Sequence, residues 1–429
     1  MIKKILILLF TFCLVYPVVF RFLPNVAFRT IYGIIGTLIL VFSKKQQLVI
    51  GNNVLKVVYA LLAVLIFAIV SNIVNGTTES QFIYLIYSFI LVFLAAYVVT
   101  RMIKSVHKRV DFDLISTYII AAATLQCLLS ALMVLIPSFG TFMLETLTKP
   151  ESAGSVAAGK SFRLLGVGAQ FVTLGIINSF ALLMIVDKLK DKHSIKTTLL
   201  LFLLFIFITI IGSMMSRTTI LGVAIGLVLM FVFNRFQIQR YIKPIIFGAF
   251  FVALLYFVAL PASTKAKFDN YFEFGFEMFY TYDKGGELTT TSTDELREML
   301  LIQPDNWKTW LIGDGYFDDP FRPFFYYKDT DVGYFRLIFY FGIFGCIIYT
   351  YYQYQIIWQA NLRTNRKHQV FFIFCFILFL ILSIKVFVEV ISVFMMFLFS
   401  EDEIESNDCM QDTGSTQRHR LIKKNYATS

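Results

Sequence analysis

Two arginines lie beside apolar runs that are long enough to cross a membrane. Arg217 stands in Ser216-Arg217-Thr218-Thr219, between two such runs with almost no loop, and Arg163 shortly precedes another. An arginine at membrane depth is unfavourable unless it faces a partner or a water-filled cavity. Guanidinium groups offer paired donors and keep their charge, so both residues are candidates for binding phosphate. The structural alternatives are an interfacial anchor at Arg217 and an ordinary loop charge at Arg163.

Acidic residues crowd the end of the long polar segment that precedes residue 333. They are Asp314, Asp318, Asp319, Asp329 and Asp331. A carboxylate beside a membrane-level cavity can act as a general base. Asp331 is the best placed, because it stands at the mouth of the next apolar run. It can also cap that helix, and a solvated loop is the simpler explanation for the other four.

Further polar and aromatic groups in this region are candidates for substrate binding. They include the cations Arg297 and Arg336, the second of which lies one turn inside the following apolar run. We also expect Asp314 and Tyr316 to contact substrate. The aromatic residues of 265–283 fall at helical spacing, which favours an amphipathic helix on the bilayer surface over sugar stacking.

Several common catalytic groups are missing near these residues. The histidines are His107, His193, His368 and His419, and all fall in or beside basic loops. The five cysteines show neither disulfide nor metal spacing. Gly159-Lys160-Ser161 lacks the earlier glycine of a phosphate-binding GxxxxGK[ST] loop. The sequence therefore predicts no metal, no cofactor, and no catalysis by His or Cys.

The composition is that of a membrane protein, with 58% hydrophobic and 15% charged residues. Apolar runs near twenty residues recur along the chain. We predict transmembrane helices at about 2–20, 26–42, 54–74, 82–100, 114–136, 169–186, 197–215, 218–234, 244–260 and 333–354, with a further apolar run at 370–399. Lys385 and Glu389 interrupt that last run, which favours a hairpin of two short helices. The fold class is therefore all-α and polytopic, with about twelve spans, or eleven if the last run is one helix.

Lys and Arg gather in every second loop, which assigns those loops and both termini to the cytoplasm. Residues 262–330 contain thirteen acidic and seven basic residues, a net charge of −6, so the basic excess of the chain is not outside. Anionic lipid explains that excess better than nucleic acid does.

The predicted organisation follows from these assignments. Helices one to nine occupy 1–260, with a small outer loop at 137–168. A long extracytoplasmic loop spans 261–332, and the C-terminal helices span 333–399. The segment Ser292-Thr293-Asp294-Glu295 resembles a capping box, so we expect a short helix there within the long loop. Residues 400–429 are predicted to be a disordered cytoplasmic tail.

Five short motifs, distributed over about 26–390, together resemble one known family. They are Arg163-Leu164-Leu165-Gly166, Ser216-Arg217, Gly313-Asp314-Gly315-Tyr316, Asp331 and Gly342-Ile343-Phe344-Gly345. Their order and the long outer loop resemble the O-antigen polymerase and O-antigen ligase superfamily of bacterial envelope enzymes. The resemblance implies a place in the bacterial cytoplasmic membrane and a donor glycan linked to undecaprenyl diphosphate, without nucleotide sugar or metal.

The resemblance also implies roles for individual residues. Arg163 and Arg217 would hold the donor diphosphate and stabilise its charge as the sugar–phosphate bond breaks. A hydroxyl of the next lipid-linked repeat unit would attack the anomeric carbon, and Asp331 would accept its proton. Arg297 and Arg336 would help to bind the diphosphate or the acceptor. The long loop would act as a lid, and a flippase and a chain-length regulator are the expected partners.

Three alternatives remain open at this point. The family's ligases, which transfer finished glycan to lipid A core, carry an outer His where this chain has Asp331, with ten residues between it and Gly342. The polymerase is therefore favoured. A polyprenyl-phosphosugar glycosyltransferase would place paired acids in the first outer loop, and residues 17–29 contain none. A polysaccharide transporter or flippase would predict internal pseudo-symmetry and charges at mid-membrane, and the sequence indicates neither.

Overall fold

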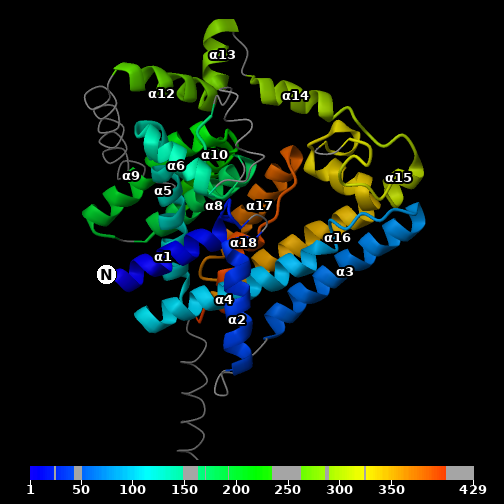
Figure 1. Ribbon diagram of the computed structural model, residues 1–429, viewed down its shortest axis with the longest axis horizontal. Coiled ribbons are helices and arrows are strands. Elements are labelled where there is room, and N and C mark those ends of the chain that lie inside the picture. The colour runs from blue at the N-terminus through cyan, green and yellow to red at the C-terminus, as the bar shows by residue number, and fades with distance from the viewer. Residues whose placement is uncertain are drawn as a thin grey trace, which may run out of the picture.

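The computed structural model describes residues 1–23, 26–42, 51–147, 163–169, 171–191, 193–233, 262–285, 289–322 and 325–401. These residues form helices joined by turns (Figure 1). Within these ranges, strand-like pairing is limited to two isolated bridges, Val19 with Ala27 and Asp318 with Tyr326. The expected all-α class is confirmed.

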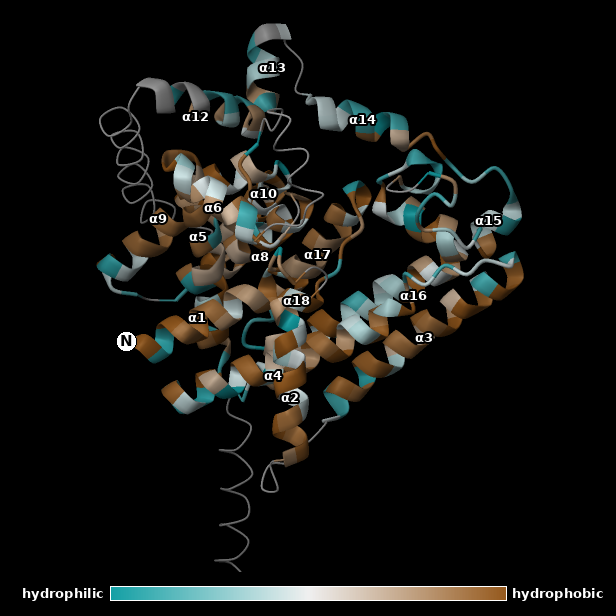
Figure 2. Cartoon of the chain, in the orientation of Figure 1, coloured by the Kyte–Doolittle hydropathy of each residue, from teal (hydrophilic) through white to brown (hydrophobic). Residues whose placement is uncertain are grey.

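Six helices in the described ranges are long and apolar enough to cross a membrane. They are α3 (Asn52–Asn75), α4 (Tyr84–His107), α5 (Phe112–Leu135), α8 (Phe171–Leu189), α9 (Ile195–Met215) and α16 (Gly333–Arg363). Shorter apolar helices are α2 (Phe28–Phe42), α10 (Thr218–Phe233) and α17 (Gln369–Lys385). Hydrophobic residues dominate most of these elements (Figure 2). A hydrocarbon core of about 30 Å requires about 20 helical residues, so the structure is that of a membrane protein.

One expected span is shorter than predicted, and another lies outside the described residues. The first helix, α1 (Ile2–Val15), ends well before residue 20, because the chain leaves the helix at Tyr16 and pairs Val19 with Ala27. The expected span 244–260 lies outside the described residues, as does the tail from 402 onward.

Helix α8 lies at the centre of the bundle. Every residue from Leu174 to Leu189 is buried, which is the pattern of a helix enclosed on all sides. Its neighbours are α5, α9, α10 and α17. Gly222 of α10 allows close contact, since a Cβ there would overlap Ser179.

Helix α16 is broken where two glycine motifs meet. Phe341 leaves the helical conformation and Gly342 has φ +71°. The Asp314 N–H donates to the Phe339 carbonyl (2.6 Å) and the Gly315 N–H donates to the Tyr340 carbonyl (3.1 Å). The loop amides thus bond carbonyl groups beside the break, as buried backbone polar groups require. A Cβ at Gly342 would overlap the Leu311 carbonyl, so this contact needs glycine.

The apolar run 370–399 turns back after Lys385, but the expected pair of short helices is only partly correct. After α17 ends, Val386, Val388 and Val390 are buried alternately in an extended segment. Two short helices follow, α18 (Ile391–Phe394) and η3 (Met395–Phe399). The returning arm does not form a continuous helix because α16 satisfies its backbone: Tyr349 Oη donates to Val388 O (2.8 Å), and Val390 N–H donates to Gln353 Oε1 (3.1 Å). The arm ends beside Val110, where the Glu401 N–H donates to the Val110 carbonyl (2.7 Å).

Short helices with more polar sequences gather at one end of the bundle (Figures 1 and 2). They are α12 (Ala262–Gly275), α13 (Glu277–Gly285), α14 (Thr291–Met299) and α15 (Trp307–Leu311), followed by the 3-10 turn η2 (Tyr327–Asp329). The expected helicity of 265–283 is confirmed, with a break at Phe276. The helix expected near Ser292 is also present, but its cap is Thr290, whose Oγ1 accepts from the Thr293 N–H (3.1 Å). The small loop 137–168 begins with another helix, α6 (Pro137–Leu147).

Candidate functional site

Arg163 and Arg217 come together beneath α12. The guanidinium carbon of Arg217 lies 4.2 Å from the ring centroid of Phe274, and that of Arg163 lies 5.2 Å from the same centroid. Arg163 also lies over Phe171, the first residue of α8, at 4.2 Å. The two cations that the sequence singled out, 54 residues apart in the chain, therefore share one aromatic partner.

The loop that carries Arg163 is fixed by main-chain contacts. The Leu164 N–H donates to the carbonyl of Met214 at the end of α9 (3.0 Å), and Ser130 Oγ donates to the Leu165 carbonyl (2.6 Å). Gly166 fits against Leu174, where a Cβ would stand 2.5 Å from a side-chain carbon. The Arg-x-x-Gly motif is thus held beside the end of α9, where the Ser-Arg motif follows Met214 and Met215 in the chain.

Arg217 is bound by the α12–α13 junction. Its Nε donates to the Phe274 carbonyl (2.9 Å), and its Nη2 forms an ion pair with the Glu277 carboxylate. Glu277 also accepts from the Thr291 hydroxyl (2.7 Å), which joins the start of α14 to this pair. The guanidinium donors thus engage a carboxylate and a carbonyl, which are the groups that an anionic ligand would replace.

The electrostatics of the pair favour an anion. Burial and the charge of Arg217 lower the pKa of Arg163 from its ordinary value. Burial lowers the pKa of Arg217 as well, against the opposing effect of Glu277 and Glu295. Arginine nevertheless stays charged at neutral pH. Two half-buried like charges repel each other, and a bound anion relieves that repulsion.

Asp331 lies at the same end of the bundle, ahead of α16. Its backbone N–H donates to Met299 Sδ of α14 (3.3 Å). Burial raises the pKa of Asp331 above its ordinary value, and the charges of Arg336 and Lys385 partly offset that shift. The capping role considered for Asp331 is wrong: Val332 is the N-cap residue, no side chain caps this helix, and the Val332 N–H donates to Thr330 Oγ1 (3.3 Å). The carboxylate is therefore not used to begin α16.

Lys385 is a further cation in this group that the sequence did not assign to the site. It ends α17 and interacts electrostatically with Arg163, Arg217, Asp331 and Glu295. In the sequence it stood out only as an interruption of an apolar run. A charged residue inside such a run is itself a signal of function, and that signal could have found it.

Arg336 has a structural explanation. Its guanidinium lies between two rings, 3.7 Å from the centroid of Phe317 and 3.6 Å from that of Tyr326. Its Nη2 donates to Asp318 Oδ1 (3.2 Å), and the side chain is only 6% exposed. Arg336 therefore joins α16 to the loop around 317–326, and it reaches Asp331 only through its charge.

Asp314 and Tyr316 belong to the packing of the loop on α16. Asp314 accepts from Thr309 Oγ1 (2.7 Å) and from the Tyr327 hydroxyl (3.3 Å), while the ring of Tyr316 packs on Tyr327 at 5.4 Å. Burial, with the Asp314 charge, raises the pKa of Tyr327 to about 12, so its hydroxyl stays a donor. These contacts fix the loop around the glycine motif, and the carboxylate of Asp314 is already engaged.

Arg297 is much more exposed to solvent than the other candidate arginines. It is on α14, its side chain is 70% exposed, and it stands 3.6 Å from Asp294 of the same helix. Glu295 of the same helix interacts electrostatically with Arg217. The structure thus groups Arg163, Arg217, Asp331 and Lys385 at one end of the bundle. In the ranges described above, no His, Cys, Asp and Glu side chains form a group of three that could hold a metal ion.

Comparison of the chain with protein-family models, with curated proteins and with solved structures finds no match.

Proposed function

We propose that this protein is a polysaccharide polymerase that joins oligosaccharide repeat units carried on undecaprenyl diphosphate. The observation that supports this most is the pair of half-buried arginines that share Phe274, with Lys385 interacting electrostatically with both of them and with Asp331. Such a pair suits a diphosphate, which needs several charge-assisted donors at once. The apolar helices suit a donor and an acceptor that are both held in lipid by their polyprenyl chains. The product would be an O-antigen, capsular or exopolysaccharide chain.

The proposed reaction uses these side chains in distinct roles. A hydroxyl oxygen of the acceptor sugar forms a bond to the anomeric carbon of the donor, and the bond from that carbon to the diphosphate oxygen breaks. Arg163 and Arg217 stabilise the negative charge that develops on the departing undecaprenyl diphosphate. Asp331 accepts the proton of the attacking hydroxyl, and its raised pKa brings it closer to the range in which a general base works well.

The segment α12–α14 would act as a lid on this site. Phe274 and Glu277 contact Arg217 directly, and Glu277 also bonds Thr291 at the start of α14. A diphosphate that binds Arg217 must displace Glu277, so donor binding would be coupled to movement of these helices. In the proposed topology this end of the bundle faces outward from the bacterial cytoplasmic membrane, and both chain termini lie in the cytoplasm.

The deciding experiment is a gel of surface glycans from cells that lack the gene, complemented with the wild-type protein or with a variant. Loss of the ladder, leaving core with a single repeat unit, is expected without the gene and with Arg217→Lys, because lysine cannot donate bidentately. Arg21→Lys is the matched control, since Arg21 is exposed and lies in the predicted first outer loop. Protein amounts must be equal in the membrane fraction.

Other outcomes would select another function. Loss of all lipid A-linked glycan, with long polymer still on undecaprenyl diphosphate, would indicate the ligase. Export failure without accumulation of a single repeat unit outside would indicate a transporter. One observation favours that last alternative: Glu389 lies in the returning arm, and its Oε1 has no hydrogen-bond partner in the described ranges, as found along ion pathways. An unchanged ladder would exclude this glycan as substrate.

A further inference from the structure

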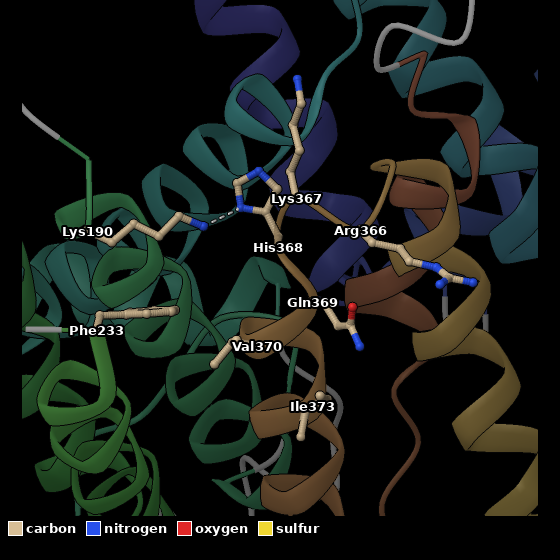
Figure 3. Close-up of a pocket in the computed structure, with 8 residues that line it drawn as sticks. All are labelled: Lys190, Phe233, Arg366, Lys367, His368, Gln369, Val370 and Ile373. Carbon is tan, nitrogen blue, oxygen red and sulfur yellow. Dashed lines mark hydrogen bonds between the residues drawn. The ribbon is translucent and has the colours of Figure 1, made fainter.

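A second charged site lies at the opposite end of the helices, where α17 begins. An open pocket of about 390 Å³ is lined by Lys190, Phe233, Arg366, Lys367, His368, Gln369, Val370 and Ile373 (Figure 3). It combines three cations and a histidine with an apolar wall. None of these residues takes part in the site beneath α12–α14.

The basic side of the pocket is fixed by a short network. Lys190 Nζ lies 2.7 Å from Asp187 Oδ1 and 3.0 Å from His368 Nδ1, and His368 Nδ1 lies 2.5 Å from Asp187 Oδ2. The His368 ring also stacks on Phe112 with centroids 3.7 Å apart. Figure 3 shows Lys190 reaching toward His368, with Arg366 on the other side of the histidine. Asp187 thus offsets part of the positive charge and holds two of the basic groups in place.

The apolar side of the pocket continues along α17. Val370, Ile373, Ile377 and Ile384 are all exposed, and their spacing puts them on one face of the helix. In a membrane such a row contacts acyl chains. The pocket therefore joins a cation cluster at its mouth to a hydrocarbon-compatible surface, in the same order as the headgroup and tail of a lipid.

We propose that this pocket binds the phosphate headgroup of an anionic phospholipid, with one acyl chain along Val370, Ile373 and Ile377. The cations Lys190, Arg366 and Lys367 would contact the phosphate, and the N-terminus of α17 adds a favourable dipole. A free phosphate would use the cations but not the exposed row, so the row favours the lipid. Basic pockets between membrane helices on the cytoplasmic side are suited to such headgroups.

The chain offers a local reporter for this site. The Arg366 guanidinium lies 5.9 Å from the ring centroid of Trp358, whereas the other two tryptophans, Trp307 and Trp310, lie in α15 at the loop end. A full-length Trp307→Phe/Trp310→Phe protein therefore carries Trp358 as its single tryptophan. Quenching of its fluorescence by brominated phosphatidylglycerol, compared with brominated phosphatidylcholine at equal mole fraction, reports binding next to Arg366.

The expected result is stronger quenching by the anionic lipid. Arg366→Gln with Lys367→Gln should weaken that preference about 25-fold, at roughly fivefold for each basic residue removed. Lys56→Gln with Lys196→Gln is the matched control, because it removes two exposed cations from the starts of α3 and α9 at the same end. Gel filtration and circular dichroism verify that each variant is folded.

Three outcomes of the comparison between lipids and between variants would overturn the proposal. They are equal quenching of the wild-type background by the two lipids, an unchanged preference in the Arg366→Gln/Lys367→Gln variant, and an equal loss in the control variant. Displacement of the brominated lipid by an equal concentration of soluble glycerol phosphate would also overturn it, in favour of a free phosphate ligand. The comparison of the two lipids in the wild-type background uses no charge variant. It therefore tests the proposal even if the Arg366→Gln/Lys367→Gln variant does not fold.

Discussion

Arg163 and Arg217 contact the same ring, that of Phe274, from two different loops of the bundle. The ring belongs to α12, and the next helix, α13, supplies Glu277 to Arg217. The arginine pair and these two helices thus form one unit, in which the carboxylate of Glu277 engages a cation that the proposed mechanism requires. This arrangement leads to the first prediction.

Glu277→Gln should tighten the binding of anionic donor about fivefold, because the ligand no longer competes with a carboxylate whose ion pair is worth about 1 kcal/mol. The measurement is the Kd of a short-chain polyprenyl diphosphate for the purified protein. Glu298→Gln is the control, since Glu298 is exposed on α14. Weaker binding in Glu277→Gln would instead mean that Glu277 orients Arg217 for the ligand.

Asp331→Asn should reduce polymerisation at least about 100-fold, as expected for loss of a general base. In the wild-type enzyme the base must be unprotonated, so activity should fall as the pH is lowered through the pKa of Asp331. Burial raises that pKa, so the fall should begin above the range of an ordinary aspartate, whose pKa is about 3.9. The pH profile of single-turnover polymerisation in membranes measures this. A flat acid limb would exclude Asp331 as the base.

Lys385→Met should move that acid limb to higher pH. The positive charge of Lys385 lowers the pKa of Asp331, and its removal lets burial raise the pKa further. Lys385→Arg keeps the charge and should leave the limb in place. Ile384→Met controls for the change of shape at the end of α17. If Lys385→Met and the wild type share one pH profile, Lys385 does not act on the base.

Gly342→Ala should destabilise the protein by about 2–4 kcal/mol, because alanine is strained at positive φ and its Cβ overlaps the Leu311 carbonyl. Gly76→Ala separates the two effects. Gly76 is in the left-handed helical region (φ +63°, ψ 28°) and has no atom within 4 Å of an added Cβ, so about 1 kcal/mol is expected there. Gly342, with ψ −176°, is in a region adopted almost only by glycine, so its backbone strain is at least as large. Unfolding in denaturant, followed by circular dichroism in detergent, gives both values. Equal losses would mean that the close contact between the loop and the break in α16 contributes nothing.

The sequence by itself determined the elements that depend on local composition. Runs of apolar residues near twenty in length predicted the six described helices that are long and apolar enough to cross a membrane. The aromatic spacing of 265–283 and the Ser/Thr-rich segment near 292 indicated the short helices of the loop. The two arginines were also recognisable, because arginines are uncommon in short loops on the predicted outer side.

Tertiary structure decided the features that depend on partners distant in the chain. The break at Gly342 forms because amides of Asp314 and Gly315 bond to α16 and because Ser71 Oγ donates to the Tyr340 carbonyl (2.5 Å), across 269 positions. The returning arm after Lys385 leaves the helical conformation because α16 supplies its hydrogen bonds. Local sequence does not predict such hydrogen bonds, because any backbone amide can form them.

Contacts between residues distant in the chain also decide which charged residues form the candidate site. The sequence indicated Arg336 as a substrate ligand, but its guanidinium is enclosed by Phe317 and Tyr326. Lys385 was only an interruption of an apolar run in the sequence. In the structure it interacts electrostatically with Arg163, Arg217 and Asp331. Residue type indicates which side chains can bind an anion. Only the packing of α9, α12, α16 and α17 decides which of those charges meet, because electrostatic interaction depends on distance in space and on burial.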